Sequence, residues 1–136
     1  MTAMGGGIEV ALRSLLGPDG AGIPQRHVVV FTDGMQNRNP IVTSHPNGVV
    51  DIADVPGWLP SNVSVPLLQP RVLDTTLGVK IHTIGVGATP QFTGLLADIA
   101  DRTDGEPWVT VNPQVDLRNF FVQNVIAALR PLTPRL

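Results

Sequence analysis

Hydrophobic and polar positions follow helical or extended spacing along most of this chain. Residues 5–16 place apolar side chains at the i, i+3, i+4, i+7 and i+8 positions that form one face of a helix. These residues are Ile8, Ala11, Leu12, Leu15 and Leu16. Gly17-Pro18 comes next, and proline cannot continue the helical hydrogen-bond ladder. The pattern therefore predicts an amphipathic helix over 5–16.

Three further segments have the composition of strands. Residues 27–32 (HVVVFT) are apolar without alternation, which is typical of a strand covered on both faces of a parallel sheet. Residues 79–87 (VKIHTIGVG) are rich in β-branched side chains and end on glycines. Residues 106–111 (EPWVTV) form a shorter run. We predict a strand in each segment.

Helix start and stop signals bound two more helices. Thr89-Pro90 supplies a hydroxyl cap and a proline at the first helical position. Asp104-Gly105 supplies a left-handed stop. Asp116 is placed to cap a final helix over 117–129. A short helix over 71–78, ending at Gly78, is also expected.

Residues 37–70 show no sustained period. Six of the thirteen prolines of the chain fall in this segment, together with Asn47-Gly48. Such residues interrupt both helices and strands. We predict a long ordered loop or an insertion within a single domain that spans residues 1–136.

The order of these elements is helix, strand, loop, strand, helix, strand, helix. Alternation of this kind predicts a three-layer α/β/α, Rossmann-like sandwich with a mainly parallel sheet and right-handed crossovers. Ligands of such sheets bind beyond the carboxyl ends of the strands. Asp33, Gly85 and Gly87 stand at such ends.

Composition narrows the class of protein. With 136 residues, 43% of them hydrophobic, the chain has the size and apolar content of one globular domain. Its net charge is −2 without a basic run, so we expect no nucleic-acid partner. No apolar segment approaches the roughly 20 residues of a bilayer span. The absence of cysteine excludes disulfides and thiol chemistry.

The ordered motifs resemble the von Willebrand factor A (vWA) domain. These motifs are VVVFTDG, then VKIHTIGVG, then LLADIADRTDGEPWVTV and a closing DLRNFF helix. The opening TAMGGGIEVAL resembles the helix that precedes the T-D-G strand in that family. The resemblance covers nearly the whole chain except the Pro-rich 37–70 stretch. It implies a non-catalytic module that binds a protein partner at the carboxyl-end face of the sheet.

The resemblance also implies a divalent-cation site. The family holds its metal with an N-terminal D-x-S-x-S motif, a threonine and a distal aspartate, and the last two correspond here to Thr2 and Asp33. No D-x-S-x-S occurs in these residues, so the sequence resembles the C-terminal half to two-thirds of the domain. Magnesium needs six oxygen ligands. We therefore expect Mg²⁺ or another divalent cation only in the complete domain, and none bound by this chain alone.

Two observations bear on that assignment. Aspartate before glycine is also a common turn sequence, which is the alternative for Asp33. In the family, the strand that carries D-x-S-x-S lies beside the T-D-G strand. Without it, residues 28–31 become a sheet edge with unpaired amides, and we expect homo-oligomers formed through that edge.

The residues after Asp33 are candidates for partner contacts. Met35, Gln36 and Asn37 would shape the rim of the binding face. Trp58 lies between prolines on the same long segment, where an aromatic side chain can anchor a partner. The alternative for Trp58 is that it folds back and forms a small core for the insertion.

The remaining polar residues favour no enzyme. His27, His45 and His82 lack metal-ligand spacing, and His82 within a strand is expected to be a half-buried packing residue. Asp51 and Asp54 are expected to be solvated loop charges. No nucleophile is found with its base. Two alternatives stay open: a small nucleotide- or phosphate-binding α/β enzyme that uses the turn GVGATP, and a metal-free structural module.

Overall fold

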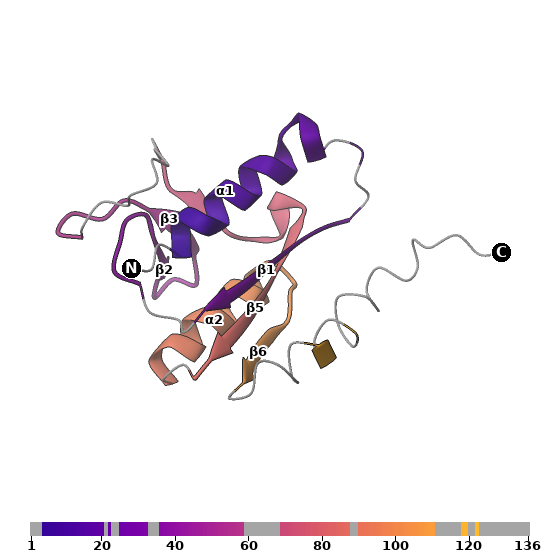
Figure 1. Ribbon diagram of the computed structural model, residues 1–136. Helices are drawn as coiled ribbons and strands as arrows, with labels where there is room; N and C mark the ends of the chain where they lie inside the picture. Colours follow the sequence, from indigo (N-terminus) through magenta and orange to yellow (C-terminus); the bar gives the residue numbers. More distant parts are fainter. Residues whose placement is uncertain are drawn as a thin grey trace.

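The structure is a computed structural model of the whole chain and describes residues 4–20, 22, 25–32, 36–58, 69–87, 90–110, 118, 119 and 122. It contains two α-helices, two 3₁₀ turns and six strands within these ranges (Figure 1). In chain order the elements are α1 (Met4–Leu16), η1 (Pro18–Gly20), β1 (Arg26–Thr32), β2 (Ile41–Ser44), β3 (Val50–Ala53), β4 (Arg71–Val72), η2 (Thr75–Leu77), β5 (Val79–Val86), α2 (Pro90–Arg102) and β6 (Pro107–Thr110).

The three predicted strands form one parallel sheet. Its order is β1-β5-β6, with β1 paired to β5 from Arg26↔Val79 to Thr32↔Gly85. β5 pairs with β6 from Thr83↔Pro107 to Val86↔Thr110. The prediction of an α/β fold with a parallel sheet is therefore confirmed. Among the described strands β1 has a neighbour on one side only, so the predicted sheet edge at 28–31 is also present.

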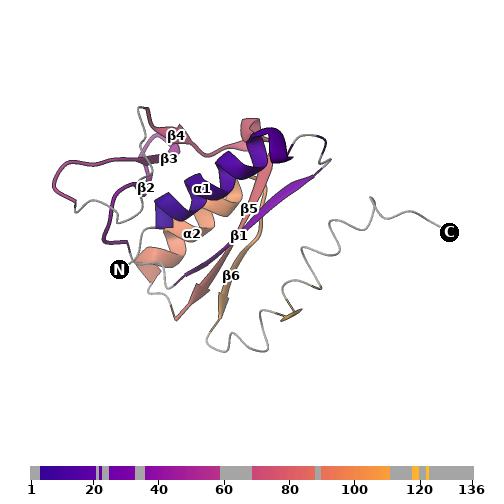
Figure 2. The same cartoon turned by 45° about the horizontal axis from the view of Figure 1, so that its top comes forward.

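Both described helices pack on the same face of this sheet (Figure 2). Side chains from α1, α2 and alternate positions of β1 and β5 meet there in one core. A second sheet contributes to the same core from the other side of the helices. The buried members are Met4, Ile8, Leu12, Val28, Val42, Val50, Ile52, Leu73, Val79, Ile81, Leu96 and Ile99.

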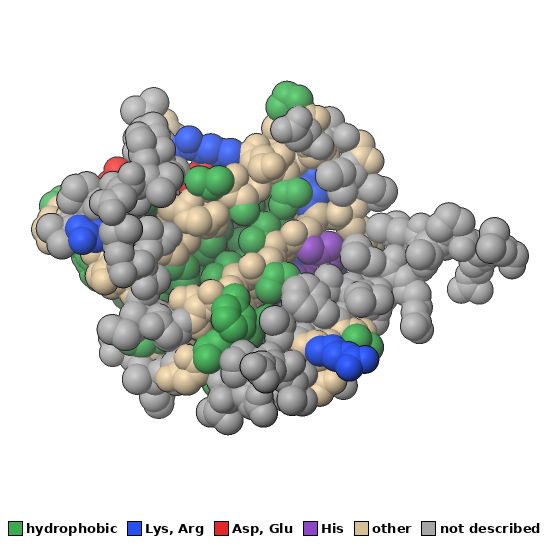
Figure 3. Space-filling model, in the orientation of Figure 1, with side chains coloured by type: hydrophobic (Ala, Val, Ile, Leu, Met, Phe, Trp, Pro, Cys, Tyr) green, Lys and Arg blue, Asp and Glu red, His purple; other side chains and the backbone are tan. Residues whose placement is uncertain are grey.

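The opposite face of β1 is less buried than its apolar run predicts. Phe31 keeps 52% of its surface exposed, whereas Val28 on the helix side keeps 9%. Hydrophobic side chains gather over β1 and beside α1 on the face that Figure 3 shows. The expected helix over 117–129, which would supply the second helical layer of a three-layer sandwich, lies outside the described residues except for 118, 119 and 122.

The predicted stop of α2 at Asp104-Gly105 is confirmed, with one refinement. Asp104 takes the left-handed conformation (φ 62°), and the Gly105 N–H donates to the Ala100 carbonyl at 2.8 Å. Gly105 is required for a different reason, since a Cβ there would lie 2.0 Å from the Ile81 carbonyl oxygen. The helix therefore ends where its terminal turn passes directly over β5.

The described part of the 37–70 segment, predicted to be a long ordered loop or an insertion, contains two strands. β2 and β3 form an antiparallel hairpin that continues to β4 in a second sheet of order β2-β3-β4. Gly48 closes the hairpin turn at φ +88°, and an Asn-Gly pair such as Asn47-Gly48 is favoured in such turns. Ile52 is fully buried, and burial of such a side chain contributes about 2 kcal/mol. The hairpin is part of the main core.

The expected helix over 71–78 is reduced to β4 and the single 3₁₀ turn η2. Asp74 caps this turn by accepting from the Thr76 N–H at 2.9 Å. Gly78 ends it in the left-handed conformation at φ 69°. The predicted end at Gly78 is thus confirmed, but the segment before it is too short for an α-helix. No helix among the described ranges is long and apolar enough to cross a bilayer.

A buried carboxylate joins α1 to the second sheet. Glu9 on α1 is completely buried, and its two oxygens accept from Arg71 of β4 at 2.8 and 2.9 Å. Arg13, one helical turn later, donates to the same carboxylate at 2.7 Å. Burial alone would raise the pKa of Glu9, but the hydrogen bonds from Arg71 and Arg13 outweigh it and hold that pKa below its ordinary value.

Candidate functional site

The carboxyl ends of the parallel strands define the predicted binding face. β1 ends at Thr32, immediately before Asp33. The predicted metal ligands Asp33 and Thr2, and the predicted contact residue Met35, lie outside the described residues. Within the described ranges no three His, Asp or Glu side chains are grouped as a metal ion requires. The cation site therefore stays a prediction.

Gln36, a predicted contact residue at the same end, is engaged inside the chain. Its amide Nε2 donates to the Val42 carbonyl at 2.9 Å, and its Oε1 accepts from the Val42 N–H at 2.7 Å. One side chain thereby makes both hydrogen bonds that a neighbouring strand would make to this residue. Gln36 covers the outer edge of β2 at Val42.

Asn39 fixes the loop that carries Trp58. The Asn39 Oδ1 accepts from the Val55 N–H at 2.9 Å, and its Nδ2 donates to the Val55 carbonyl at 3.0 Å. A longer contact of 3.4 Å joins the same Nδ2 to the Trp58 carbonyl. Asn37, also predicted to contact a partner, is exposed on this segment. The loop around Trp58 is therefore tied to the segment that follows β1.

A groove of about 610 Å³ lies between β2 and α2. Trp58 lines it and stays 40% exposed, so this side chain is neither fully folded into a core nor fully projecting. Ser44 Oγ donates to Asp98 Oδ2 at 2.7 Å within the groove. The described lining residues are Gln36, Ile41, Val42, Thr43, Ser44, Trp58, Phe92, Gly94, Leu95 and Asp98.

Two histidines form a hydrogen-bonded pair on the sheet face away from the helices. His27 Nδ1 lies 2.9 Å from His82 Nε2, and His82 Nδ1 accepts from the backbone N–H of Glu106 at 3.1 Å. A backbone N–H only donates, so the proton of neutral His82 is on Nε2, where it is directed to His27 Nδ1. His27 in turn carries its proton on Nε2, 3.4 Å from Gln25 Oε1. Glu106, His82, His27 and Gln25 thus form a relay of hydrogen bonds. Each bond is donated in the same direction, from the Glu106 N–H toward Gln25 Oε1.

This relay resists an added proton. A further proton on either imidazole would place two hydrogens in one hydrogen bond. Burial lowers the pKa of His82 to about 4, with further contributions from His27 and the Lys80 ammonium. Burial and Lys80 also lower the pKa of His27. His82 is thus fully buried and hydrogen-bonded, whereas the sequence predicted a half-buried packing residue.

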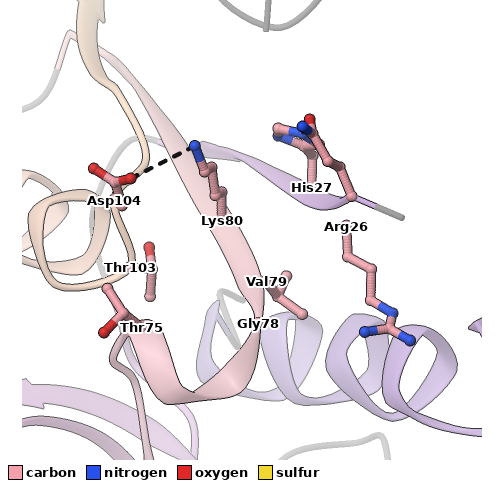
Figure 4. Close-up of a pocket in the computed structure, with 9 residues that line it drawn as sticks. Arg26, His27, Thr75, Gly78, Val79, Lys80, Thr103 and Asp104 are labelled. Atoms are coloured by element: carbon pink, nitrogen blue, oxygen red, sulfur yellow. Dashed lines mark hydrogen bonds and ion pairs between the residues drawn. The ribbon is translucent and has the colours of Figure 1, made fainter. Parts of the chain in front are cut away.

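An open cavity of about 290 Å³ adjoins His27 at the amino ends of β1 and β5 (Figure 4). Lys80 extends between Asp104 and His27, and its Nζ lies 3.5 Å from Asp104 Oδ2. The pair is largely exposed, so its contribution to stability is small. This cavity is at the opposite end of the sheet from the predicted binding face.

The second sheet changes one more prediction. Asp51, expected to be a solvated loop charge, belongs to β3 and lies 3.1 Å from His45 Nε2 with 15% of its side chain exposed. Asp54 is exposed, in agreement with the sequence. Ser44 and His45 are neighbours in the chain, but Ser44 bonds Asp98 and His45 bonds Asp51. The two side chains are thus engaged with different carboxylates.

Comparison of the chain with protein-family models, with curated proteins and with solved structures finds no match.

Proposed function

We propose that this chain is part of a non-catalytic, protein-binding module of the vWA type. The complete domain would hold Mg²⁺ or another divalent cation at the carboxyl ends of the parallel strands and bind a partner protein there. Asp33 would orient a metal-bound water, and Thr2 would be a direct ligand. The observation that carries the proposal is the parallel order β1-β5-β6, in which β1 has a neighbour on one side only among the described strands.

The open edge is where the family places its missing strand. That strand would pair with β1 on the side opposite β5 and would bring D-x-S-x-S next to Asp33. A three-layer sandwich belongs to the same proposal, with a helix over 117–129 on the sheet face away from α1. In its support, that face of the strands carries Phe31, Ile84 and Trp108 in register, and an apolar face of a parallel sheet requires a cover.

Manganese binding tests the metal site. Mn²⁺ broadens the NMR signals of nearby amides, so it locates even a weak site in this chain. Because this chain alone is expected to have negligible affinity for the ion, we expect only slight broadening, at high Mn²⁺ concentration, centred on residues 32–37 and removed by Asp33→Asn. Asp101→Asn, which changes an exposed carboxylate on α2, is the matched control and leaves it in place. Broadening that survives Asp33→Asn would refute the assignment of Asp33.

The same chain extended by its upstream coding sequence gives the stronger test. Affinity for Mn²⁺ is expected to rise steeply when that segment supplies D-x-S-x-S after a hydrophobic strand, because three more oxygen ligands then converge on the ion. An upstream segment without the motif would favour the metal-free structural module instead.

The open edge also supports a proposal on assembly. Residues 28–31 would pair with the same strand of a second copy when no other strand covers them. Phe31→Lys places a charge beside this edge and should shift the sedimentation profile to monomer. Val10→Lys, at a residue of similar exposure on α1 (49% against 52%), should leave it unchanged. A wild-type chain that sediments as a monomer at all concentrations would rule out edge pairing.

A further inference from the structure

The groove between β2 and α2 has an edge of strand backbone along one wall. In the antiparallel pair β2-β3, Val42 and Ser44 lie opposite Ile52 and Val50. Backbone groups of successive residues in such a strand point to opposite sides, so those of alternate residues point to the same side. Since Val42 bonds outward to Gln36, Ser44 directs its own N–H and C=O the same way, along the groove.

Gln36 acts as an internal substitute for a strand at this wall. A carboxamide carries the same donor and acceptor as a peptide group, and here both are used on Val42, at 2.9 and 2.7 Å. Among the contacts of the described residues, it covers one of the two outward positions of β2, at Val42. An extended peptide laid along β2 would make the bonds that Gln36 makes and would continue to Ser44.

The other wall and the floor of the groove set the chemistry of such a peptide. Phe92 and Leu95 of α2, with Ile41 and Trp58, give apolar contacts for alternate side chains. Asp98 is the single acidic side chain among the described lining residues, and it is exposed. A basic side chain on the ligand would complement this charge.

We propose that this groove binds an extended segment of a partner protein, apolar at alternate positions and carrying one lysine or arginine, which adds to β2 and displaces the Gln36 amide. The inference rests on the proposed protein-binding function and assigns it a second surface that needs no metal. Trp58 anchors the segment, and Asp98 pairs with its basic residue.

Selection from a random heptapeptide library displayed on phage tests the proposal. The immobilised chain is expected to enrich peptides with alternating apolar residues and one basic residue, with or without EDTA. Synthetic copies of the enriched peptides should change the fluorescence of Trp58. A library from which no such pattern emerges would overturn the inference, because the groove then lacks the proposed specificity.

Variants separate the proposed contacts. Trp58→Phe should weaken peptide binding, measured by calorimetry, and Asp98→Asn should weaken it about fivefold through loss of the ion pair. Gln36→Ala should strengthen it about fivefold, because the peptide no longer competes with the resident amide. Val10→Ala, at an exposed apolar residue of α1, is the control without effect. Weaker binding in Gln36→Ala would contradict displacement, since it would make Gln36 a direct contact.

The outcomes also distinguish this surface from the metal site and from self-assembly. If Asp33→Asn abolishes Mn²⁺ broadening while peptide binding persists, the result would support the groove as a peptide-binding surface separate from the metal site. Loss of self-association in Trp58→Phe without peptide enrichment would assign the groove to a second copy of this chain and refute the partner segment.

Discussion

Acidification should destabilise this protein through the relay of His27 and His82. The folded pKa of His82 is about 4, against an ordinary value of 6.5, because the ring is buried and faces His27 and Lys80. A folded pKa below the unfolded one means that the unfolded chain takes up the proton. The stabilisation is therefore complete above pH 6.5, decreases as the pH falls toward 4, and is absent below both values.

The magnitude follows from the two pKa values. A pKa that falls from 6.5 to about 4 corresponds to about 3 kcal/mol of unfolding free energy, of which about 2 kcal/mol is lost between pH 7.5 and 5. This is a large share of the 5–15 kcal/mol of a typical domain. The lowered pKa of His27 acts in the same direction. Most carboxylates titrate below pH 5, so the upper part of the range isolates the histidines.

Urea denaturation at pH 7.5 and pH 5 measures this loss. His82→Asn is the informative variant, because its Oδ1 can accept from the Glu106 N–H in place of Nδ1 but does not titrate. We expect it to lose less stability on acidification than the wild type, by about 2 kcal/mol. Equal losses in the two proteins would refute the reasoning. An imidazole NMR spectrum with the His82 proton on Nδ1 at pH 7.5 would contradict the relay itself.

Four further substitutions test the packing of the fold by urea denaturation. Glu9→Gln should destabilise by about 2 kcal/mol, because two arginines lose a buried carboxylate, whereas Arg13→Ala, at a half-exposed partner, should cost less than about 0.5 kcal/mol. Gly105→Ala should destabilise by more than about 2 kcal/mol, since its Cβ would overlap the Ile81 carbonyl. Gly94→Ala in α2 has no atom within 4 Å of the new Cβ and should stabilise by up to about 1 kcal/mol. The reverse order for the two glycines would contradict the packing of α2 on β5.

The sequence predicted the elements whose apolar pattern is long. The helices over 5–16 and from Pro90, and the strands 27–32 and 79–87, have their expected bounds to within two residues. The hairpin of β2 and β3 was missed because each strand has only four residues and prolines surround them. The alternation of Val50 and Ile52 was present, but it is too short to distinguish from a loop by pattern alone.

A candidate site can be predicted from the sequence only when its residues lie close together along the chain. His27 and His82 are 55 residues apart, and they meet because the parallel register places both on one face of adjacent strands. The engagement of Gln36 by Val42 depends on the path of the chain after β1. Neither contact can be predicted from the spacing of the residues along the sequence. Asp33 and Thr2 were chosen by resemblance, and their roles stay predictions.

The two hydrogen bonds between the Asn39 carboxamide and Val55 give the chain a short mechanical link. Asn39, on the segment after β1, forms hydrogen bonds with both the backbone N–H and the backbone carbonyl of Val55 in the Trp58 loop. Within the described part of the chain, a force applied to the indole by a bound molecule would be transmitted through this side chain to the segment that precedes β2. Asn39→Ala would remove both hydrogen bonds between this segment and Val55 in the Trp58 loop. Faster hydrogen exchange at the Val55 amide would show their loss.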